Sequence, residues 1–301
     1  MLDSEEIDSF RKAGGIIAKL RREVPALVKP GKPVIEICEE LEHRIKTLGG
    51  EPAFPVNVGI NEIAAHYTSP PGDTLTIPRA CIVKIDFGVH IKGYLADTAV
   101  TVVFDPHFEP MARAADEALS SAIRAFRPGV KMSEVGRIIQ TTVERYGFKP
   151  IRNLTGHSIQ RYTIHAGKSV PNVSQLNGGK TVEGEVYAIE PFVTRANASG
   201  AVTNTASAHI YRFIKTKGAK TEEAKKVIQE VYSQFSSLPF AARWLERKFT
   251  REIAVRAIKE LLDSKCIGSY PVLIEETRQP VAQSEHTVLV TADGCSVLTG
   301  S

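Results

Sequence analysis

Residues 80–104 constrain this chain most strongly, because they contain two apolar, β-branched runs around a short polar turn that ends at Gly93. This pattern is typical of a β-hairpin. Each of the two runs carries one acid, Asp86 in the first and Asp97 in the second. With the turn centred between Ile91 and Lys92, we expect these two carboxylates to be direct cross-strand neighbours.

Two carboxylates side by side on an apolar sheet need a counter-charge, because like charges placed opposite each other destabilise a sheet. We expect Lys84 and Lys92 to lie on the opposite pleat from Asp86 or at the turn, where neither can supply it. A divalent cation is the simplest remaining counter-charge, and carboxylate oxygens are suitable ligands for one. The alternative from the hairpin alone is that one acid lies at a frayed strand end and both are solvated.

Length and composition favour a soluble globular protein of one large domain or two ordinary ones. The chain has 301 residues, of which 43% are hydrophobic and 24% are charged. It contains no run of 18 apolar residues, and the stretch from Met1 to Glu6 is acidic, so we expect neither a membrane-spanning helix nor a signal peptide. The net charge of +4 permits transient contact with nucleic acid without arguing for it. Scattered cysteines predict reduced thiols and a cytoplasmic location; they are Cys38, Cys81, Cys266 and Cys295.

An internal repeat is visible in the first half of the chain. Ser4 can cap a helix that Pro30-Gly31 ends, and a second helix ends at Gly49-Gly50. The same order recurs 98 residues later, with Pro128-Gly129, Val143, Gly147 and Pro150 in the places of Pro30-Gly31, Ile45, Gly49 and Pro52. We interpret this recurrence as a duplication, in which each half has two helices on one side of a sheet and a hairpin that follows. Chance similarity between helical segments is the alternative.

A duplication predicts a second hairpin with two acids. Its strands would be residues 186–190, which end in Glu190, and residues 287–291, which follow Glu285. Between them, residues 212–268 are predicted to form an inserted helical subdomain, with helices capped by Thr221 and Thr250 and a short apolar piece around Trp244. We interpret its basic residues as a solvated helix face rather than an RNA or ribosome contact; they are Arg243, Arg247, Arg251, Arg256 and Lys259.

One histidine, His157, completes a metal-binding constellation. Most lone histidines are ordinary core or surface residues, but His157 follows a glycine in a polar loop. One imidazole and four carboxylates are the donor set that two divalent ions about 3.5 to 4 Å apart require, whereas a single zinc site more often uses two or three His or Cys ligands. The five candidate ligands are Asp86, Asp97, His157, Glu190 and Glu285.

The ordered ligand set and its surroundings resemble the methionine aminopeptidases of the M24 metallopeptidase family. The resemblance extends from about residue 4 to the C-terminus, and the 11-residue spacing between the two aspartates is part of it. The helical insertion and the lack of a long N-terminal extension are similar to archaeal members of the type 2 subfamily. The motifs that carry the resemblance are Gly156-His157-Ser158-Ile159, Ile164-His165-Ala166-Gly167-Lys168, Ala188-Ile189-Glu190-Pro191-Phe192 and Glu285-His286-Thr287.

The resemblance implies an α+β pita-bread fold of the creatinase/aminopeptidase kind. Residues 1–301 would be a single catalytic domain of two duplicated halves, and residues 212–268 would be a winged-helix-like insertion. Asp86 would chelate one metal ion, Asp97 and Glu285 would bridge both ions, and His157 and Glu190 would complete the other site. The ions would be Co, Mn, Fe or Zn, between which the sequence does not decide.

The activity that the resemblance implies is removal of the N-terminal methionine from nascent polypeptides with a small second residue, by a hydroxide that two metal ions activate. Glu190 would be the general base. His66 and His165 match the histidines that contact the substrate amide, and the methionine side chain would lie among Phe54, Ile164 and Tyr270. We expect a monomer that makes at most transient contact with the ribosome and none with a membrane.

Two other functions remain open from the sequence. A proline-specific aminopeptidase or prolidase shares the fold and the ligands, but these enzymes carry a large extra domain before the catalytic half, and here the first helix starts at residue 4. The second is a non-catalytic protein of the same fold that holds RNA or a partner through the basic insertion. Such relatives have usually lost metal ligands, and all five are present here.

Overall fold

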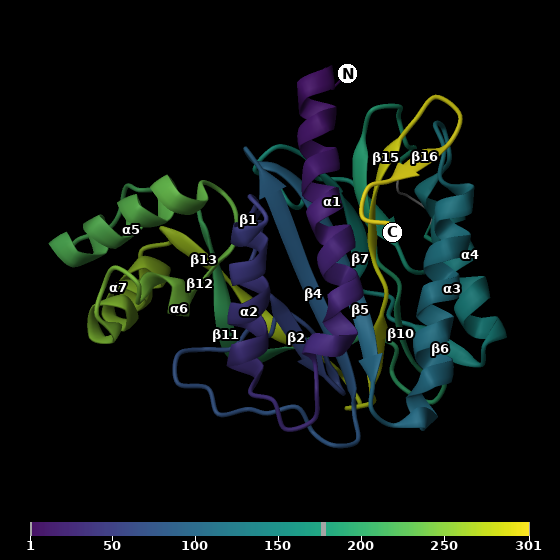
Figure 1. Ribbon diagram of the computed structural model, residues 1–301, viewed down its shortest axis with the longest axis horizontal. Helices are drawn as coiled ribbons and strands as arrows, with labels where there is room; N and C mark the ends of the chain where they lie inside the picture. Colours follow the sequence, from purple (N-terminus) through teal and green to yellow (C-terminus); the bar gives the residue numbers. More distant parts are fainter. Residues whose placement is uncertain (1, 176–178, 301) are drawn as a thin grey trace.

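The computed structural model describes residues 2–175 and 179–300, and its first half is a pair of helices packed on a sheet (Figure 1). The helices α1 (Ser4–Leu27) and α2 (Val34–Thr47) cover one face of this sheet with a continuous apolar core. The strands of the sheet are β1 (Glu51–Pro52), β2 (Asn57–Ile60), β4 (Ile82–Ile91) and β5 (Tyr94–Val103). None of the helices in the described part of the chain combines the length and apolarity needed to cross a lipid bilayer.

The cap of α1 differs from the expected one. Asp3, rather than Ser4, is the N-cap: its side chain accepts a hydrogen bond from the Glu6 amide at 2.9 Å, and the Glu6 carboxylate accepts one from the Asp3 amide at 2.9 Å. This reciprocal capping box satisfies two amides that would otherwise lack partners, which a serine one residue later does not achieve.

The hairpin β4–β5 forms as predicted, but the predicted register is wrong by two residues. Ile91 pairs with Tyr94, so Lys92 and Gly93 are the two turn residues, with φ of 52° and 88°. Positive φ at both positions is what a two-residue type I′ turn requires. Asp86 therefore lies opposite Ala99, and Asp97 lies opposite Gly88. The two carboxylates share a face of the hairpin as diagonal neighbours rather than as a direct pair.

The expectation that Lys84 lies on the opposite pleat is also wrong. Lys84 and Asp86 are two residues apart on β4, so their side chains leave the same face. The Lys84 side chain is 1% exposed, and its ammonium donates to the carbonyl oxygens of Asn61 at 3.1 Å and Val281 at 2.9 Å. Burial lowers the pKa of Lys84 to about 7.

The second half repeats the pattern of helices packed on strands. After a short 3-10 turn, η1 (Pro106–Phe108), the helices α3 (Glu109–Ala125) and α4 (Met132–Arg145) pack against each other and against two sheets (Figure 1). One sheet consists of β6 (Phe148–Pro150), β10 (Phe192–Arg195) and β14 (Val281–Gln283). The other consists of β7 (Thr155–Ile159), β8 (Ser169–Pro171), β9 (Val186–Ile189), β15 (His286–Val290) and β16 (Cys295–Val297).

The 98-residue spacing recurs in the geometry of the two halves. The helix α2 begins at Val34 and α4 at Met132, and the glycines before them, Gly31 and Gly129, have φ of 83° and 80°. The strands β9 and β15 pair antiparallel even though some hundred residues separate them, so Glu190 and Glu285 follow and precede the same end of one ladder. A common origin of the halves stays a prediction.

A helical unit with its own apolar core lies at the opposite side of the molecule from α3 and α4 (Figure 1). It contains α5 (Glu222–Phe235), α6 (Ala242–Leu245) and α7 (Arg251–Asp263), and Thr221 and Thr250 cap α5 and α7 as predicted. It extends from a sheet of β3 (Ile63–Ala65), β11 (Val202–Phe213), β12 (Phe240–Ala241) and β13 (Ile267–Glu275).

The interpretation of Arg243 as part of a solvated basic face is wrong, because its guanidinium is buried in an ion pair with Glu42 of α2. Other arginines of the set lie at the surface, where Arg256 pairs with Glu223 at 3.2 Å. The amphipathic pattern of the sequence did not distinguish the buried Arg243 from the exposed arginines. Its partner Glu42 lies on α2, which is remote in the sequence and is not part of that pattern.

Two adjacent glycines in α1 provide a test of this packing. A β-carbon on Gly14 would lie 2.2 Å from the Leu298 carbonyl oxygen, whereas one on Gly15 would meet nothing within 4 Å. We expect Gly14→Ala to destabilise the fold by about 1–3 kcal/mol through overpacking. Gly15→Ala should stabilise it by about 0.5–1 kcal/mol, because alanine is the better helix former. Urea unfolding of both variants measures the difference, and equal stability of the two would show that α1 does not pack on the C-terminal segment in this way.

Candidate metal centre and substrate cavity

All five candidate ligands line one cavity of about 340 Å³. The hairpin supplies two of them, since Asp86 lies in β4 and Asp97 in β5. His157 is the middle residue of β7, while Glu190 directly follows β9 and Glu285 directly precedes β15. Segments that are far apart in the sequence therefore bring one imidazole and four carboxylates to the same place.

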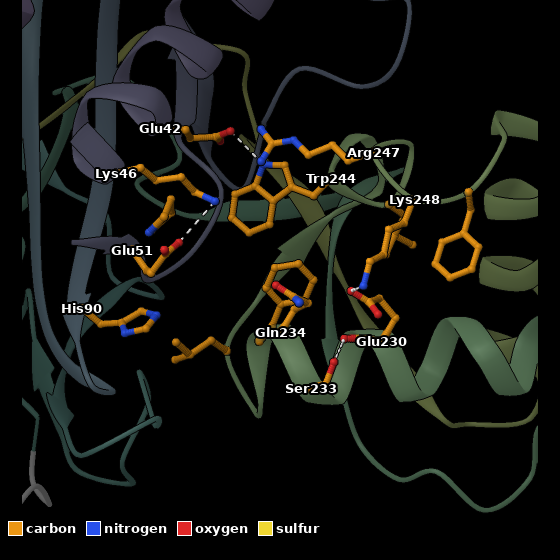
Figure 2. A pocket seen from close by; sticks show the side chains of 15 residues that line it. Glu42, Lys46, Glu51, His90, Glu230, Ser233, Gln234, Trp244, Arg247 and Lys248 are labelled. Carbon is orange, nitrogen blue, oxygen red and sulfur yellow. Dashed lines mark hydrogen bonds and ion pairs between the residues drawn. The ribbon is translucent and has the colours of Figure 1, made fainter. Parts of the chain in front are cut away.

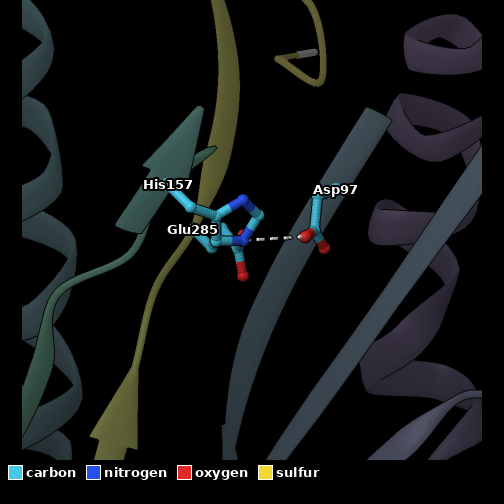
Figure 3. Close-up of side chains that lie close together, drawn as sticks. All are labelled: Asp97, His157 and Glu285. Carbon is cyan, nitrogen blue, oxygen red and sulfur yellow. Dashed lines mark ion pairs between the residues drawn. The ribbon is translucent and has the colours of Figure 1, made fainter. Parts of the chain in front are cut away.

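Three of these side chains point at one another across the gap between the hairpin and the second half (Figure 3). Asp97, His157 and Glu285 each offer a ligand atom within 4.8 Å of the others. The Nε2 atom of His157 lies 3.7 Å from Oδ2 of Asp97 and 3.5 Å from Oε1 of Glu190. These separations leave room for a cation between the donor atoms.

The electrostatics of the cavity favour bound cations. Burial raises the pKa of Asp86 to about 7, and burial together with the neighbouring carboxylates raises the pKa values of Asp97, Glu190 and Glu285 well above their ordinary range. Buried oxygens of Asp86, Asp97 and Glu285 have no hydrogen-bond partner in the protein. Because buried acceptors without partners are costly, and because hard carboxylate oxygens with one imidazole suit divalent ions, this donor set fits a metal centre.

Residues that no sequence motif marks hold the backbone of the candidate ligands in place. The Thr287 hydroxyl bonds to both the amide and the carbonyl of Asp97, at 2.7 and 2.8 Å. The Thr98 hydroxyl donates to the Glu285 carbonyl at 2.8 Å, and the Arg21 guanidinium donates to the same carbonyl at 3.0 Å. Thr98 directly follows Asp97 and Thr287 is two residues after Glu285, so their proximity in the sequence was a usable signal. Arg21 lies in α1, and no motif marks it.

The residues expected to contact substrate line the same cavity; they are Phe54, His66, Ile164, His165 and Tyr270. The ring of His165 lies edge-on to that of His157, with 4.5 Å between centroids, and the ring of His66 is 5.3 Å from that of Tyr270. The sequence did not identify Asn57, Phe192 or Ile210, which also line the cavity. Pro239 is a lining residue as well, whereas His209 lies against Tyr67, 5.8 Å between ring centroids.

The cavity histidines carry no charge near neutral pH. Burial lowers the pKa of His66 to about 4 and that of His157 to about 3, and burial with the nearby Arg212 lowers the pKa of His165. Nδ1 of His66 lies 3.2 Å from the Pro271 carbonyl oxygen, which can only accept. Nδ1 therefore carries the proton, and Nε2 of His66 is an acceptor. The residue has φ of 65°, a strained conformation for a non-glycine residue.

Comparison with known proteins agrees with this geometry. The sequence matches metallopeptidase family M24 over residues 8–292. It is 43% identical over 296 residues to the methionine aminopeptidase of Methanothermobacter thermautotrophicus, an alignment that covers 97% of this chain and 98% of that protein.

Among solved structures, a thermophilic Arx1 superposes with a TM-score of 0.83 at 19% identity, covering 100% of this chain and 92% of that chain. The methionine aminopeptidase of Thermotoga maritima superposes with a TM-score of 0.72 at 23% identity, covering 100% and 98%. At identities this low, the superpositions establish the fold alone. They confirm the predicted pita-bread architecture.

The resemblance to archaeal enzymes inferred from the sequence is confirmed by the full-length similarity to the archaeal protein. This chain belongs to metallopeptidase family M24 and, within it, to the methionine aminopeptidases of archaeal type.

Proposed function

We propose that this chain removes the N-terminal methionine from polypeptides whose second residue is small. The observation that carries the proposal is the convergence of five metal donors with His66, His165 and an apolar wall in one cavity. Relatives that match over their full length bear the same activity in their names. The buried carboxylate oxygens that lack hydrogen-bond partners also support the proposal that this cavity binds cations.

In this proposal the five donors have the roles implied by the family resemblance. Asp86 would hold one divalent ion, His157 and Glu190 would hold the other, and Asp97 and Glu285 would contribute to both. When bound, such ions supply Lewis-acid chemistry, lowering the pKa of a water molecule and polarising a peptide carbonyl. The choice between Co, Mn, Fe and Zn follows from cellular supply as much as from these ligands.

Glu190 acts as the general base. Its carboxylate lies beside the other candidate ligands, and burial together with the neighbouring acids raises its pKa, which makes the carboxylate a stronger proton acceptor. Glu190 takes a proton from the attacking water and can return it to the amine that leaves when the first peptide bond breaks.

The two histidines orient the substrate amide. Nε2 of His66, an acceptor, suits a substrate N–H, and neutral His165 can donate its ring N–H to the scissile carbonyl as negative charge develops there. Phe54, Ile164 and Tyr270 form the apolar surround for the methionine side chain, whose flexible thioether fits an irregular pocket.

We further propose that the substrates are nascent polypeptides in the cytoplasm and that the protein acts as a monomer. The region 212–268 is proposed to be an insertion in the catalytic domain. Any ribosome contact would use its exposed arginines, with Arg243 excluded because it is buried.

The substrate prediction separates this function from that of the proline-specific enzymes. Metal-loaded protein should release methionine from Met-Ala-Ser and cleave Ala-Pro-Gly at least about tenfold less efficiently, a difference in transition-state binding of about 1.4 kcal/mol. Chromatographic quantitation of the free amino acid measures both reactions. Preference for Ala-Pro-Gly would favour a prolidase-like enzyme, and tight RNA binding without release of methionine would favour a non-catalytic binding protein.

Removal of a ligand should abolish metal binding without unfolding the chain. We expect Asp97→Asn and His157→Ala to lose bound metal and at least about 100-fold in turnover, because the ions lose donors in a buried site. Metal content per chain and circular dichroism report the two properties separately. The matched control is His107→Ala, which changes a histidine whose side chain is 88% exposed and should alter neither. Full turnover in Asp97→Asn would contradict the assignment.

Glu190→Gln tests the general base. At saturating metal we expect kcat to fall by about 100-fold to 10,000-fold, the usual contribution of acid–base catalysis, while KM changes by less than about threefold. Steady-state kinetics with Met-Ala-Ser and a parallel metal titration separate proton transfer from ligand loss. If kinetics are unchanged, Glu190 has no part in proton transfer.

A further inference from the structure

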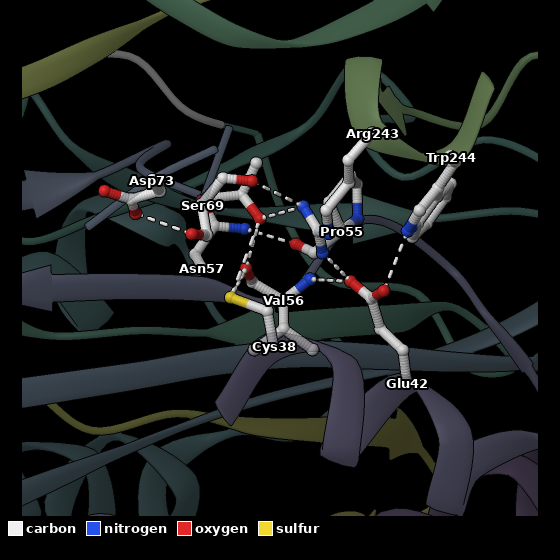
Figure 4. A network of polar contacts seen from close by, with 10 residues as sticks. Cys38, Glu42, Pro55, Val56, Asn57, Ser69, Asp73, Arg243 and Trp244 are labelled. Atoms are coloured by element: carbon white, nitrogen blue, oxygen red, sulfur yellow. Dashed lines mark hydrogen bonds and ion pairs between the residues drawn. The ribbon is translucent and has the colours of Figure 1, made fainter. Parts of the chain in front are cut away.

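A buried ion pair joins the helical unit to the first half of the molecule (Figure 4). The Arg243 guanidinium of α6 pairs with the Glu42 carboxylate of α2, and the indole N–H of Trp244 donates to the same carboxylate at 2.7 Å. The exposed fractions are 1% for Glu42, 8% for Arg243 and 9% for Trp244. We call these three side chains the Glu42 network.

The Glu42 network fixes a backbone segment that carries two cavity residues. The Glu42 carboxylate accepts a hydrogen bond from the Val56 amide at 3.2 Å, and the Val56 carbonyl accepts one from the Thr68 hydroxyl at 2.7 Å. The amide and the carbonyl of Val56 are therefore both fixed by hydrogen bonds. Phe54 and Asn57, which flank this point, line the substrate cavity.

The same network fixes the segment that follows His66. The Arg243 guanidinium donates to the Thr68 hydroxyl at 2.8 Å and to the Ser69 carbonyl at 3.2 Å. Thr68 is two residues from His66, whose backbone already has the strained φ of 65°. A strained residue persists only where its surroundings hold it, so the anchoring of Thr68 supports the placement of the His66 ring.

Arg243 is also linked through the backbone to cavity residues of β11 and β13. It follows β12 closely, and Ala241 of β12 pairs with Ile210 of β11, which in turn pairs with Tyr270 of β13. Ile210 and Tyr270 line the same cavity as Phe54 and Asn57. The ion pair therefore connects the cavity-lining segments of the first half with those of β11 and β13, in addition to the link that β3 and β13 provide near His66.

The packing beside the network is open, which increases its importance. A second cavity of about 440 Å³ lies between the helical unit and α2, with Glu42 and Trp244 in its lining (Figure 2). Lys46 and Glu51 face it from the first half, and Lys248 faces it from the helical unit. Leu238 packs against Ala53 and Phe54 beside this cavity. Because the rest of the contact is not close-packed, the directional hydrogen bonds of the Glu42 network add to this apolar contact in setting the separation of the two sides.

We propose that Glu42, Arg243 and Trp244 are positioning residues that set the width of the substrate side-chain cavity by fixing, relative to each other, the backbone segments that carry its lining residues. The inference rests on the proposed function, because it concerns selection of the methionine side chain. Substitutions in the network should alter how the side chain is bound and selected, while the candidate metal ligands on β4, β5 and β7 and at the ends of β9 and β15 stay in place.

The experiment compares KM, kcat and metal affinity in Glu42→Gln, Arg243→Lys and Trp244→Phe. With Met-Ala-Ser we expect KM to rise about tenfold in Glu42→Gln, the consequence of losing hydrogen bonds to a charged group, and kcat to change by less than about threefold. The kcat/KM preference for Met-Ala-Ser over the branched Leu-Ala-Ser should fall. Calorimetric metal titration should give wild-type stoichiometry and affinity.

Lys248→Ala is the matched control. It removes an ion pair with Glu230, 2.7 Å long, that lies within the helical unit and does not reach the first half. Lys248→Ala should keep wild-type KM and selectivity. Trp244 is the only tryptophan, so its fluorescence in Glu42→Gln, Arg243→Lys and the control checks that the helical unit stays docked.

A merely structural role would give a different result. A lower melting temperature with unchanged KM and unchanged selectivity would overturn the inference, as would loss of metal affinity in step with activity. If the single variants do not fold, the double variant Glu42→Leu/Arg243→Met replaces the buried pair with apolar groups and should fold. It should show the same change in KM and selectivity, and wild-type values in it would overturn the inference. A wild-type enzyme that fails to cleave Met-Ala-Ser would instead refute the proposed function.

Discussion

Four carboxylates in one cavity, of which Asp97 and Glu285 are buried and Asp86 and Glu190 are partly exposed, are the constraint on which the rest of this structure depends. Each is costly to ionise away from water, and together they repel one another, which is why the pKa values of Asp86, Asp97, Glu190 and Glu285 are all raised. Protein side chains offer these oxygens too few partners. The arrangement makes physical sense as a container for divalent cations, and membership of a metallopeptidase family agrees with that interpretation.

The fold supports this arrangement by tying the ends of strands together through side chains. Thr287 holds the peptide of Asp97, while Thr98 and Arg21 hold the carbonyl of Glu285, so the hairpin of the first half and the ladder of the second cannot separate easily. On the substrate side the walls come from different units. The Glu42 network connects their backbones at the edge where apolar packing is incomplete.

The sequence predicted the hairpin, the helix pairs, two of the helix caps and the family, because each depends on local patterns or on short motifs. Predictions from the sequence were wrong where burial depended on a partner remote in the sequence, or where the hairpin register depended on which two residues form the turn. The register of β4 and β5 moved by two because Lys92 and Gly93 both take positive φ. Arg243 has the spacing of a surface residue, and only the position of Glu42 in α2 shows that it is buried.

By itself, the sequence determined which side chains are available for chemistry: five candidate metal ligands, two further histidines and an apolar set, in the order characteristic of a known family. The tertiary structure alone decided their separations, their charge states and the backbone contacts that hold them. The physical reason is that identity and periodicity are properties of the chain, whereas burial, which shifts the pKa values and leaves acceptors without partners, arises only when remote segments pack together.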